Sequence, residues 1–145
     1  MTPKWRSVVV CVLMLSFFIC IIRARFDASL KGRVCNGELY PRHQASGETE
    51  HLYECAVNHV VKLMPRYTPS IRDRQFYYAM RCKDWNSESH VYGRSSCKDE
   101  LSPDDCAGCL RHALDDLFSV CTHSTGAQVQ LEDCRVRYEK YVFND

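Results

Sequence analysis

The sequence has no low-complexity tract, no internal repeat and no Asn-x-Ser/Thr sequon. These absences exclude a repeat protein and leave no acceptor for N-glycosylation. The sequence also lacks an excess of charge of either sign, because it contains 19 basic and 18 acidic residues. The six histidines are scattered, and none accompanies a nucleophile. We therefore expect no enzyme and assign no catalytic residue.

Cysteine, by contrast, is abundant, with ten in 145 residues. An apolar run from Val8 to Ile22 follows Lys4 and Arg6 at the start of the chain. This charge pattern is typical of a signal peptide, and the run is shorter than the roughly 20 residues of a membrane span. We expect residues 1–25 to be a cleaved signal peptide. An uncleaved signal anchor is the alternative, because arginines follow the run.

Cleavage changes both the cysteine count and the charge. It removes two cysteines, four basic residues and no acidic residue, leaving eight cysteines and a net charge of −3. Eight cysteines in an exported chain suit four disulfides. The acidic balance disfavours nucleic acid and anionic membranes as partners. We expect one domain over residues 27–145.

The first half of this domain predicts one helix and two strands. Helical spacing of apolar residues begins near Ser46 or Thr49 and is expected to stop at Pro65. Alternation over Gln75–Cys82 predicts a strand. A polar loop is expected over residues 84–90, before a short strand that starts at Val91.

The second half begins with the clearest element, a helix that starts after Ser102. Ser102 suits an N-cap, Pro103 the first helical position and two aspartates the first turn, and an apolar stripe then runs to Cys121. Alternation predicts strands over residues 127–132 and 135–143. The sequence thus predicts an α+β fold, in which two α-helices pack on an antiparallel sheet of about five strands.

The cysteines stand in a specific motif pattern. The pattern consists of Val34-Cys35-Asn36, Tyr92-Gly93-Arg94-x-x-Cys97, the C-x8-C-x2-C of Cys97, Cys106 and Cys109, Phe118-Ser119-Val120-Cys121, and Gly126-Ala127-x-Val129-Gln130-Leu131-x-x-Cys134-x-x-x-Tyr138-Glu139. In these residues the chain closely resembles the ginkbilobin-homologous domain, the secreted cysteine-rich module of ginkbilobin and of cysteine-rich receptor-like kinases. With one copy and no kinase, the chain is expected to be the stand-alone secreted form.

The resemblance implies a disulfide pattern that spacing alone leaves open. The implied bridges are Cys35–Cys121, Cys97–Cys106 and Cys109–Cys134. Cys55 and Cys82 have no counterpart in ginkbilobin. We place both on inner faces, Cys55 on the first helix and Cys82 on the following strand, and predict a fourth bridge between them. Two buried free thiols are the alternative.

The resemblance also implies a mannose site at Asn36, Gln128 and Glu139. A carboxylate and amides suit sugar hydroxyls, and Glu139 should be the main contact. Gln128 stands where the family has arginine, a loss of roughly 1–2 kcal/mol of binding energy. Arg137, on the same strand face as Glu139, is a hypothetical source of the missing cation. Ordinary solvated surface residues, with no ligand, are the alternative.

Two other cysteine chemistries are weaker alternatives. Cys106, Cys109 and Cys121, with His112 and His123, have the residue types of a zinc site. Cys106 and Cys109 also form a C-x-x-C pair. Export disfavours the metal site, and a helical position disfavours the redox centre. We therefore expect no metal and no cofactor.

Together these features predict a secreted plant defence protein of the apoplast. It is expected to bind mannose-containing glycans of fungal cell walls and thereby inhibit growth. The alternative is an extracellular protein–protein interaction module that binds no sugar, since a fold does not fix a function.

Overall fold

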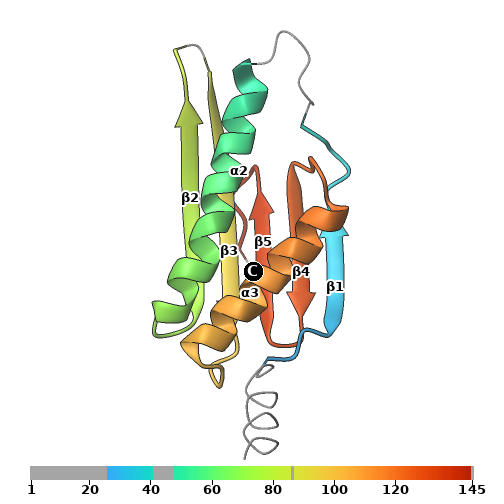
Figure 1. The fold of residues 1–145 in the computed structure, drawn as a ribbon. Helices are drawn as coiled ribbons and strands as arrows, with labels where there is room; N and C mark the ends of the chain where they lie inside the picture. The colour runs from blue at the N-terminus through green and yellow to red at the C-terminus, as the bar shows by residue number, and fades with distance from the viewer. Residues whose placement is uncertain (1–25, 41–47, 86, 145) are drawn as a thin grey trace, which may run out of the picture.

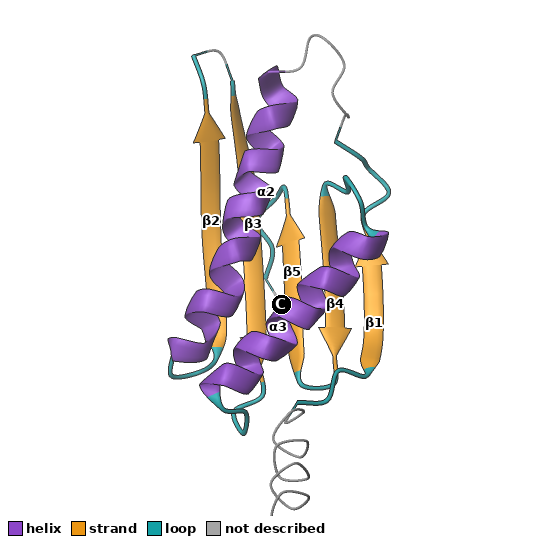
Figure 2. Cartoon of the chain, in the orientation of Figure 1, coloured by secondary structure: helices purple, strands orange, loops and turns teal. Residues whose placement is uncertain are grey.

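The computed structural model describes residues 26–40, 48–85 and 87–144. In chain order the elements are β1 (Leu30–Cys35), α2 (Glu48–Tyr67), the 3-10 helix η1 (Thr68–Ser70), β2 (Gln75–Lys83), β3 (Glu88–Cys97), α3 (Pro103–Val120), β4 (Gly126–Leu131) and β5 (Cys134–Glu139). The strands form one antiparallel sheet in the order β1-β4-β5-β3-β2. Both helices cover the same face of this sheet (Figures 1 and 2). The predicted fold class is confirmed, whereas the predicted signal peptide lies outside the described residues.

Helix α3 forms as its sequence predicts. Ser102 is the N-cap, and its Oγ accepts a hydrogen bond from the backbone N–H of Asp105 at 3.1 Å. The apolar stripe is buried at Cys106, Cys109, Leu110, Ala113, Leu114 and Leu117. It packs on β4 and β5, whose inward residues Val129 and Val136 are completely buried. The N-cap and the buried apolar stripe of α3 therefore both match those predicted from the sequence.

Helix α2 extends further than predicted, since it passes Pro65 and ends at Tyr67. A proline here removes only one backbone hydrogen bond, near the end of the helix, and its fixed φ is compatible with helical geometry. Packing stabilises the last turns of α2 instead, because Val60 and Met64 are fully buried. A Cβ placed on Gly93 of β3 would lie 2.1 Å from Cγ1 of Val60, so the missing side chain allows α2 to approach the sheet.

The bounds of two predicted strands needed correction, and one strand was missed. Strand β3 begins at Glu88 rather than Val91, because Glu88 and Ser89 pair with Lys83 and Cys82 of β2. Strand β5 ends at Glu139, and the predicted extension to residue 143 is wrong. Strand β1 was not located from the sequence. Most of its residues are exposed, so it lacks the alternation that marks a half-buried strand.

Four disulfides connect the helices to the sheet: Cys35–Cys121, Cys55–Cys82, Cys97–Cys106 and Cys109–Cys134. This is the predicted pairing. The expected inner-face position of Cys55 is wrong, because Cys55 is exposed on α2 whereas Cys82 is buried. Cys106 and Cys109 bond to different partners, which excludes both the zinc site and the redox pair considered above.

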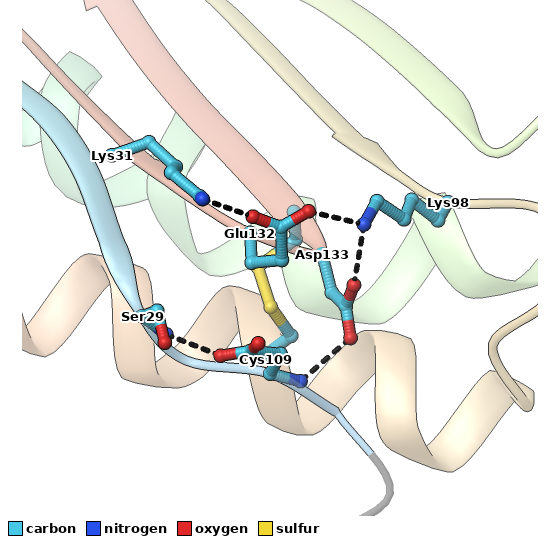
Figure 3. A network of polar contacts seen from close by, with 8 residues as sticks. Ser29, Lys31, Lys98, Cys109, Glu132 and Asp133 are labelled. Carbon is cyan, nitrogen blue, oxygen red and sulfur yellow. Dashed lines mark hydrogen bonds and ion pairs between the residues drawn. A yellow bond between two sulfur atoms is a disulfide. The ribbon is translucent and has the colours of Figure 1, made fainter.

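A polar network ties the strand ends together on the surface (Figure 3). Glu132, between β4 and β5, accepts from the Nζ atoms of Lys31 and Lys98 at 2.5 and 2.7 Å. Asp133 accepts from Lys98 at 3.0 Å and from the backbone N–H of Asp27 at 2.6 Å. Hydrogen bonds from the two ammonium groups lower the pKa of Glu132 and raise those of both lysines. The network thus fixes the start of β1 against the β4–β5 turn.

Across the described ranges, no helix combines the length and the apolar character needed to cross a bilayer.

Candidate functional site

The sheet face opposite the helices carries polar side chains. Successive side chains of a strand point to opposite faces. In β4 and β5 the helix-facing residues are apolar or cysteine, and the open face carries Gln128, Gln130, Arg135, Arg137 and Glu139. This open face is therefore the natural place to search for a site.

A cavity of about 380 Å³ lies on this face at the β1–β4–β5 end of the sheet. Strand register brings its residues together, because Gln128 lies opposite Val34 on one side and Arg137 on the other, and Gly126 pairs with Glu139. The lining residues are Val34, Asn36, Gly126, Ala127, Gln128, Arg137, Glu139 and Tyr141. The three residues of the expected sugar site thus line one cavity.

Glu139 provides the most distinctive group of this cavity. Its residue is 7% exposed, and its Oε1 accepts from Nε of Arg137 at 3.1 Å. Its Oε2 is buried and has no hydrogen-bond partner among the residues that the structure describes. A Cβ on Gly126 would lie 1.9 Å from this oxygen, so only glycine leaves room for the carboxylate. A buried acceptor without a partner is costly, and a ligand hydroxyl would satisfy it.

Asn36 reaches the cavity from the loop after β1. Its backbone N–H donates to the carbonyl of Gly126 at 2.7 Å, and its Oδ1 accepts from the N–H of Glu38 at 3.1 Å. With Oδ1 engaged, the amide NH2 is the group that suits a ligand oxygen. Ser124 donates from Oγ to the carbonyl of Asn36 at 2.5 Å and so holds the loop in place.

The open face orients Gln128 and Arg137 through neighbouring side chains. Oε1 of Gln128 accepts from an Nη of Arg135 at 3.0 Å, which leaves the NH2 of Gln128 to donate. The guanidinium carbon of Arg137 lies 4.1 Å from the centre of the Phe143 ring, a cation–π contact. Arg137 therefore provides the cavity with a positive charge, which Gln128 does not carry.

Two buried tyrosines support the floor behind the cavity. Tyr53 donates to the carbonyl of Thr125 at 2.5 Å, and Tyr138 donates to that of Ser124 at 2.9 Å. Burial is the main cause that raises the pKa of both phenols. The two side chains therefore stay neutral donors and hold the backbone that leads into Gly126.

Sequence reasoning assigned no site role to four lining residues, Val34, Gly126, Ala127 and Tyr141. The reason is clearest for Val34 and Tyr141. Val34 belongs to β1, which has no alternating pattern. Tyr141 follows Glu139 in the segment that was wrongly expected to continue as a strand. Tyr141 carries no local signal for the cavity, because the chain turns back after β5 and so brings this residue to it (Figure 1).

Comparisons with known proteins agree with the fold. A family model described as salt stress response/antifungal matches residues 34–141. The antifungal protein ginkbilobin-2 of Ginkgo biloba is 44% identical over 53 residues, which cover 37% of this chain and 40% of that protein. Plasmodesmata-located protein 8 of Arabidopsis thaliana is 41% identical over 51 residues, covering 35% of this chain and 18% of that protein. These aligned segments span two fifths or less of the relatives' own length.

A solved structure shows a similar arrangement of elements. The tandem DUF26 ectodomain of the cysteine-rich receptor-like protein PDLP8 from Arabidopsis thaliana superimposes with a TM-score of 0.67 at 24% identity. The match covers 81% of this chain and 51% of that one, so it shows the fold of one unit of the tandem.

Proposed function

The chain belongs to the salt stress response/antifungal family, the family of ginkbilobin, and from this premise we propose that its open-face cavity binds a mannose-type sugar. The family occurs as antifungal proteins and as extracellular domains of receptor-like proteins. We further propose that the protein is secreted to the apoplast, engages mannose-bearing glycans of fungal cell walls and inhibits growth by that engagement rather than by catalysis.

The unpartnered Oε2 of Glu139 is the observation that carries the proposal. A buried carboxylate oxygen, with amide groups of Asn36 and Gln128 in the same cavity, matches the acceptor and donor needs of neighbouring sugar hydroxyls. Hydrogen bonds to an ionised acceptor are the stronger ones, so Glu139 contributes most to binding.

Arg137 supplies the positive charge that the resemblance to ginkbilobin implies at the position of Gln128. It lies opposite Gln128 in the strand register, and its Nε already donates to Glu139. This geometry holds the carboxylate in place and leaves Gln128 as a neutral donor. Affinity for sugar therefore survives the replacement of the family arginine.

Calorimetric titration of the oxidised protein with methyl α-mannoside tests this function. We expect saturable binding that weakens at least tenfold in Glu139→Gln, which keeps the side-chain shape and removes the charge. Glu88→Gln is the matched control, because Glu88 is half exposed on β3 and outside the cavity. No heat of binding in the wild type, or equal affinity in Glu139→Gln, would refute the proposal.

The rival function is recognition of another extracellular protein. Exposed aromatic side chains near β2, the edge strand of the sheet, favour this function. Tyr67 at the end of α2 stacks on Phe76 of β2, which stacks on Tyr78 of the same strand, with ring centres 5.9 Å apart in both pairs. Tyr67 and Tyr78 are exposed, and Trp85 beyond the strand is fully exposed. Aromatic residues are enriched at protein interfaces. A partner captured by wild type but not by Tyr78→Ser, together with no response to mannoside, would favour this rival.

A further inference from the structure

Strand β2 is one of the two edges of the sheet and, unlike β1, has little protection against pairing with another strand. Edge strands are usually kept unpaired by being short, bulged or charged. Strand β1 has six residues, a register shift in its pairing with β4, and the charged residues Lys31 and Arg33. Strand β2 has nine residues, contains no proline and pairs with β3 in an unbroken register. None of the described elements lies on its outer side (Figures 1 and 2).

The outer backbone groups of β2 follow from the hydrogen bonds at its two ends. The N–H of Cys97 donates to the carbonyl of Arg74 at 3.1 Å, and the N–H of Asp84 donates to that of Ser87 at 3.0 Å. Both bonds continue the register of β2 with β3, in which hydrogen-bonded and non-hydrogen-bonded pairs alternate. Even-numbered residues of β2 therefore bond to β3, and odd-numbered ones direct their N–H and C=O groups outward. These outward residues are Gln75, Tyr77, Ala79, Arg81 and Lys83, and all five are exposed.

The order of these residues suits antiparallel pairing of β2 with a second copy of itself. When Ala79 lies opposite Ala79 of the copy, the whole strand overlaps and its outward residues bond to one another. Tyr77 then lies opposite Arg81, and Gln75 opposite Lys83. No like charges face each other in this register, and a cation beside an aromatic ring is favourable. Centring the pair on Arg81 instead would place two arginines opposite each other.

The side chains on the helix-facing side of β2 also match in this register. Tyr78 lies opposite Met80 of the copy, and Phe76 lies opposite Cys82. In the single chain Tyr78 is 36% exposed and Met80 is only partly buried. Pairing would cover more of both, and removal of apolar surface from water favours association. Helix α2 lies over β2 and β3 rather than beyond the edge, so it leaves the outer side of β2 open (Figure 1).

We propose that this protein forms a symmetric dimer, in which two copies of β2 pair and join the two sheets into one. Directly opposite residues of an antiparallel pair project to the same face. The two open faces therefore lie on one side of the dimer, and each carries its own cavity around Glu139. One mannose-bearing polysaccharide can then bind both cavities. This consequence rests on the proposed function, whereas the dimer itself does not.

Sedimentation equilibrium of the oxidised protein between about 1 μM and 1 mM tests the dimer. We expect the mean mass to rise with concentration from that of one chain toward that of two. Ala79→Lys and Ala79→Asp each place like charges opposite each other at the symmetry axis, so each should stay monomeric. Their equimolar mixture places opposite charges there and should dimerise again.

Gly32→Lys is the matched control for Ala79→Lys. It adds the same charge to the other edge of the sheet, where a Cβ would meet no atom within 4 Å. This variant should dimerise like the wild type. Thermal unfolding of each variant confirms that it is folded.

Two sedimentation results would overturn the dimer. One is the mass of a single chain at every wild-type concentration, which would leave the edge of β2 to a different extracellular protein. The other is wild-type self-association in folded Ala79→Lys, or a mixture of the two Ala79 variants that stays monomeric. Either would show that residue 79 does not lie opposite itself.

A surface coated with mannan tests the link to sugar binding. Ala79→Lys should bind this surface at least tenfold more weakly than the wild type, because it lacks the second attachment point. Its affinity for methyl α-mannoside in solution should be unchanged. Equal binding of wild type and Ala79→Lys to mannan would overturn the bivalent arrangement. Glu139→Gln should remain a dimer and lose mannoside binding, so failure of one proposal is distinguishable from failure of the other.

Discussion

At the scale of single residues, Glu139 and Gly126 depend on each other. The alternation of β5 predicts that Glu139 shares a face with Arg135 and Arg137, as the structure shows. Its burial and its contact with Gly126 arise from the pairing of β4 with β5, which no local pattern encodes. The sequence could therefore indicate the face of Glu139, whereas the enclosed carboxylate required the strand order.

Gly126→Ala should disable the cavity around Glu139. The new Cβ would lie 1.9 Å from Oε2 and 2.7 Å from Cδ of Glu139, which forces the carboxylate to move. We expect loss of mannoside binding and a cost of about 1–3 kcal/mol in the free energy of unfolding, as for other overpacked sites. Calorimetry and urea unfolding measure the two effects.

Gly32→Ala is the matched control for this substitution. A Cβ on Gly32 of β1 would meet no atom within 4 Å. Binding and stability should therefore stay close to those of the wild type. Unchanged mannoside affinity in Gly126→Ala would contradict the assigned role of the Glu139 carboxylate.

Glu132→Gln should lower the Tm slightly, in a pH-dependent way. The lysine contacts lower the folded-state pKa of Glu132 below its ordinary value of 4.5. The stabilisation is thus present above the unfolded-state pKa and is lost as the pH falls through the folded-state pKa. Thermal unfolding should show a Tm difference from wild type at pH 7 that shrinks below pH 4.5 and disappears once Glu132 is protonated in the folded protein.

The control is Glu88→Gln, whose carboxylate lies 3.6 Å from an Nη of Arg81 in an exposed pair. It should shift the Tm less at pH 7, since exposed and distant pairs contribute little. A Tm difference for Glu132→Gln that stays the same at low pH would show that the contacts to Lys31 and Lys98 are not its cause.

At the scale of elements, a helix or strand was predicted well where its own sequence carries a cap or a regular apolar pattern. Helix α3 has an N-cap, an N-terminal proline and a continuous apolar stripe, and its bounds were predicted closely. Helix α2 passes Pro65 because burial of Met64 outweighs one lost hydrogen bond. Strand β1 has neither cap nor alternation, so only its pairing with β4 defines it.

Gly93→Ala should weaken the packing of α2 on β3. The added Cβ would lie 2.1 Å from Cγ1 of Val60 and 2.8 Å from Cε of Met64. We expect a loss of about 1–3 kcal/mol in the free energy of unfolding, measured by guanidinium denaturation. Adding Val60→Ala removes the closest atom, so the double variant should lose less than the sum of the two single variants. Additive losses would contradict direct contact.

At the scale of the whole molecule, the disulfides join the two layers. Three of the four bridges connect α3, or its C-cap Cys121, to β1, β3 and β5. The fourth bridge connects α2 to β2. Family resemblance supplied the first three pairings. The fourth was predicted from two inner-face positions, of which only that of Cys82 is correct.

Removal of each bridge should cost stability according to the loop that it closes. Cys35–Cys121 spans 86 residues and Cys55–Cys82 spans 27. The chain-entropy relation gives about 4.6 and 3.5 kcal/mol respectively, so the double alanine variant of the longer loop should be the less stable by about 1 kcal/mol. Guanidinium unfolding of both variants measures this order, and the reverse order would contradict it.

The location of the sugar-binding cavity is the central claim, and an NMR titration of the oxidised, 15N-labelled protein with methyl α-mannoside tests it most directly. We predict saturable shifts of the backbone amides of Asn36, Gln128, Glu139 and Tyr141, with little change at α2 and α3. Shifts confined to other parts of the molecule, or no shifts at saturating mannoside, would contradict the account.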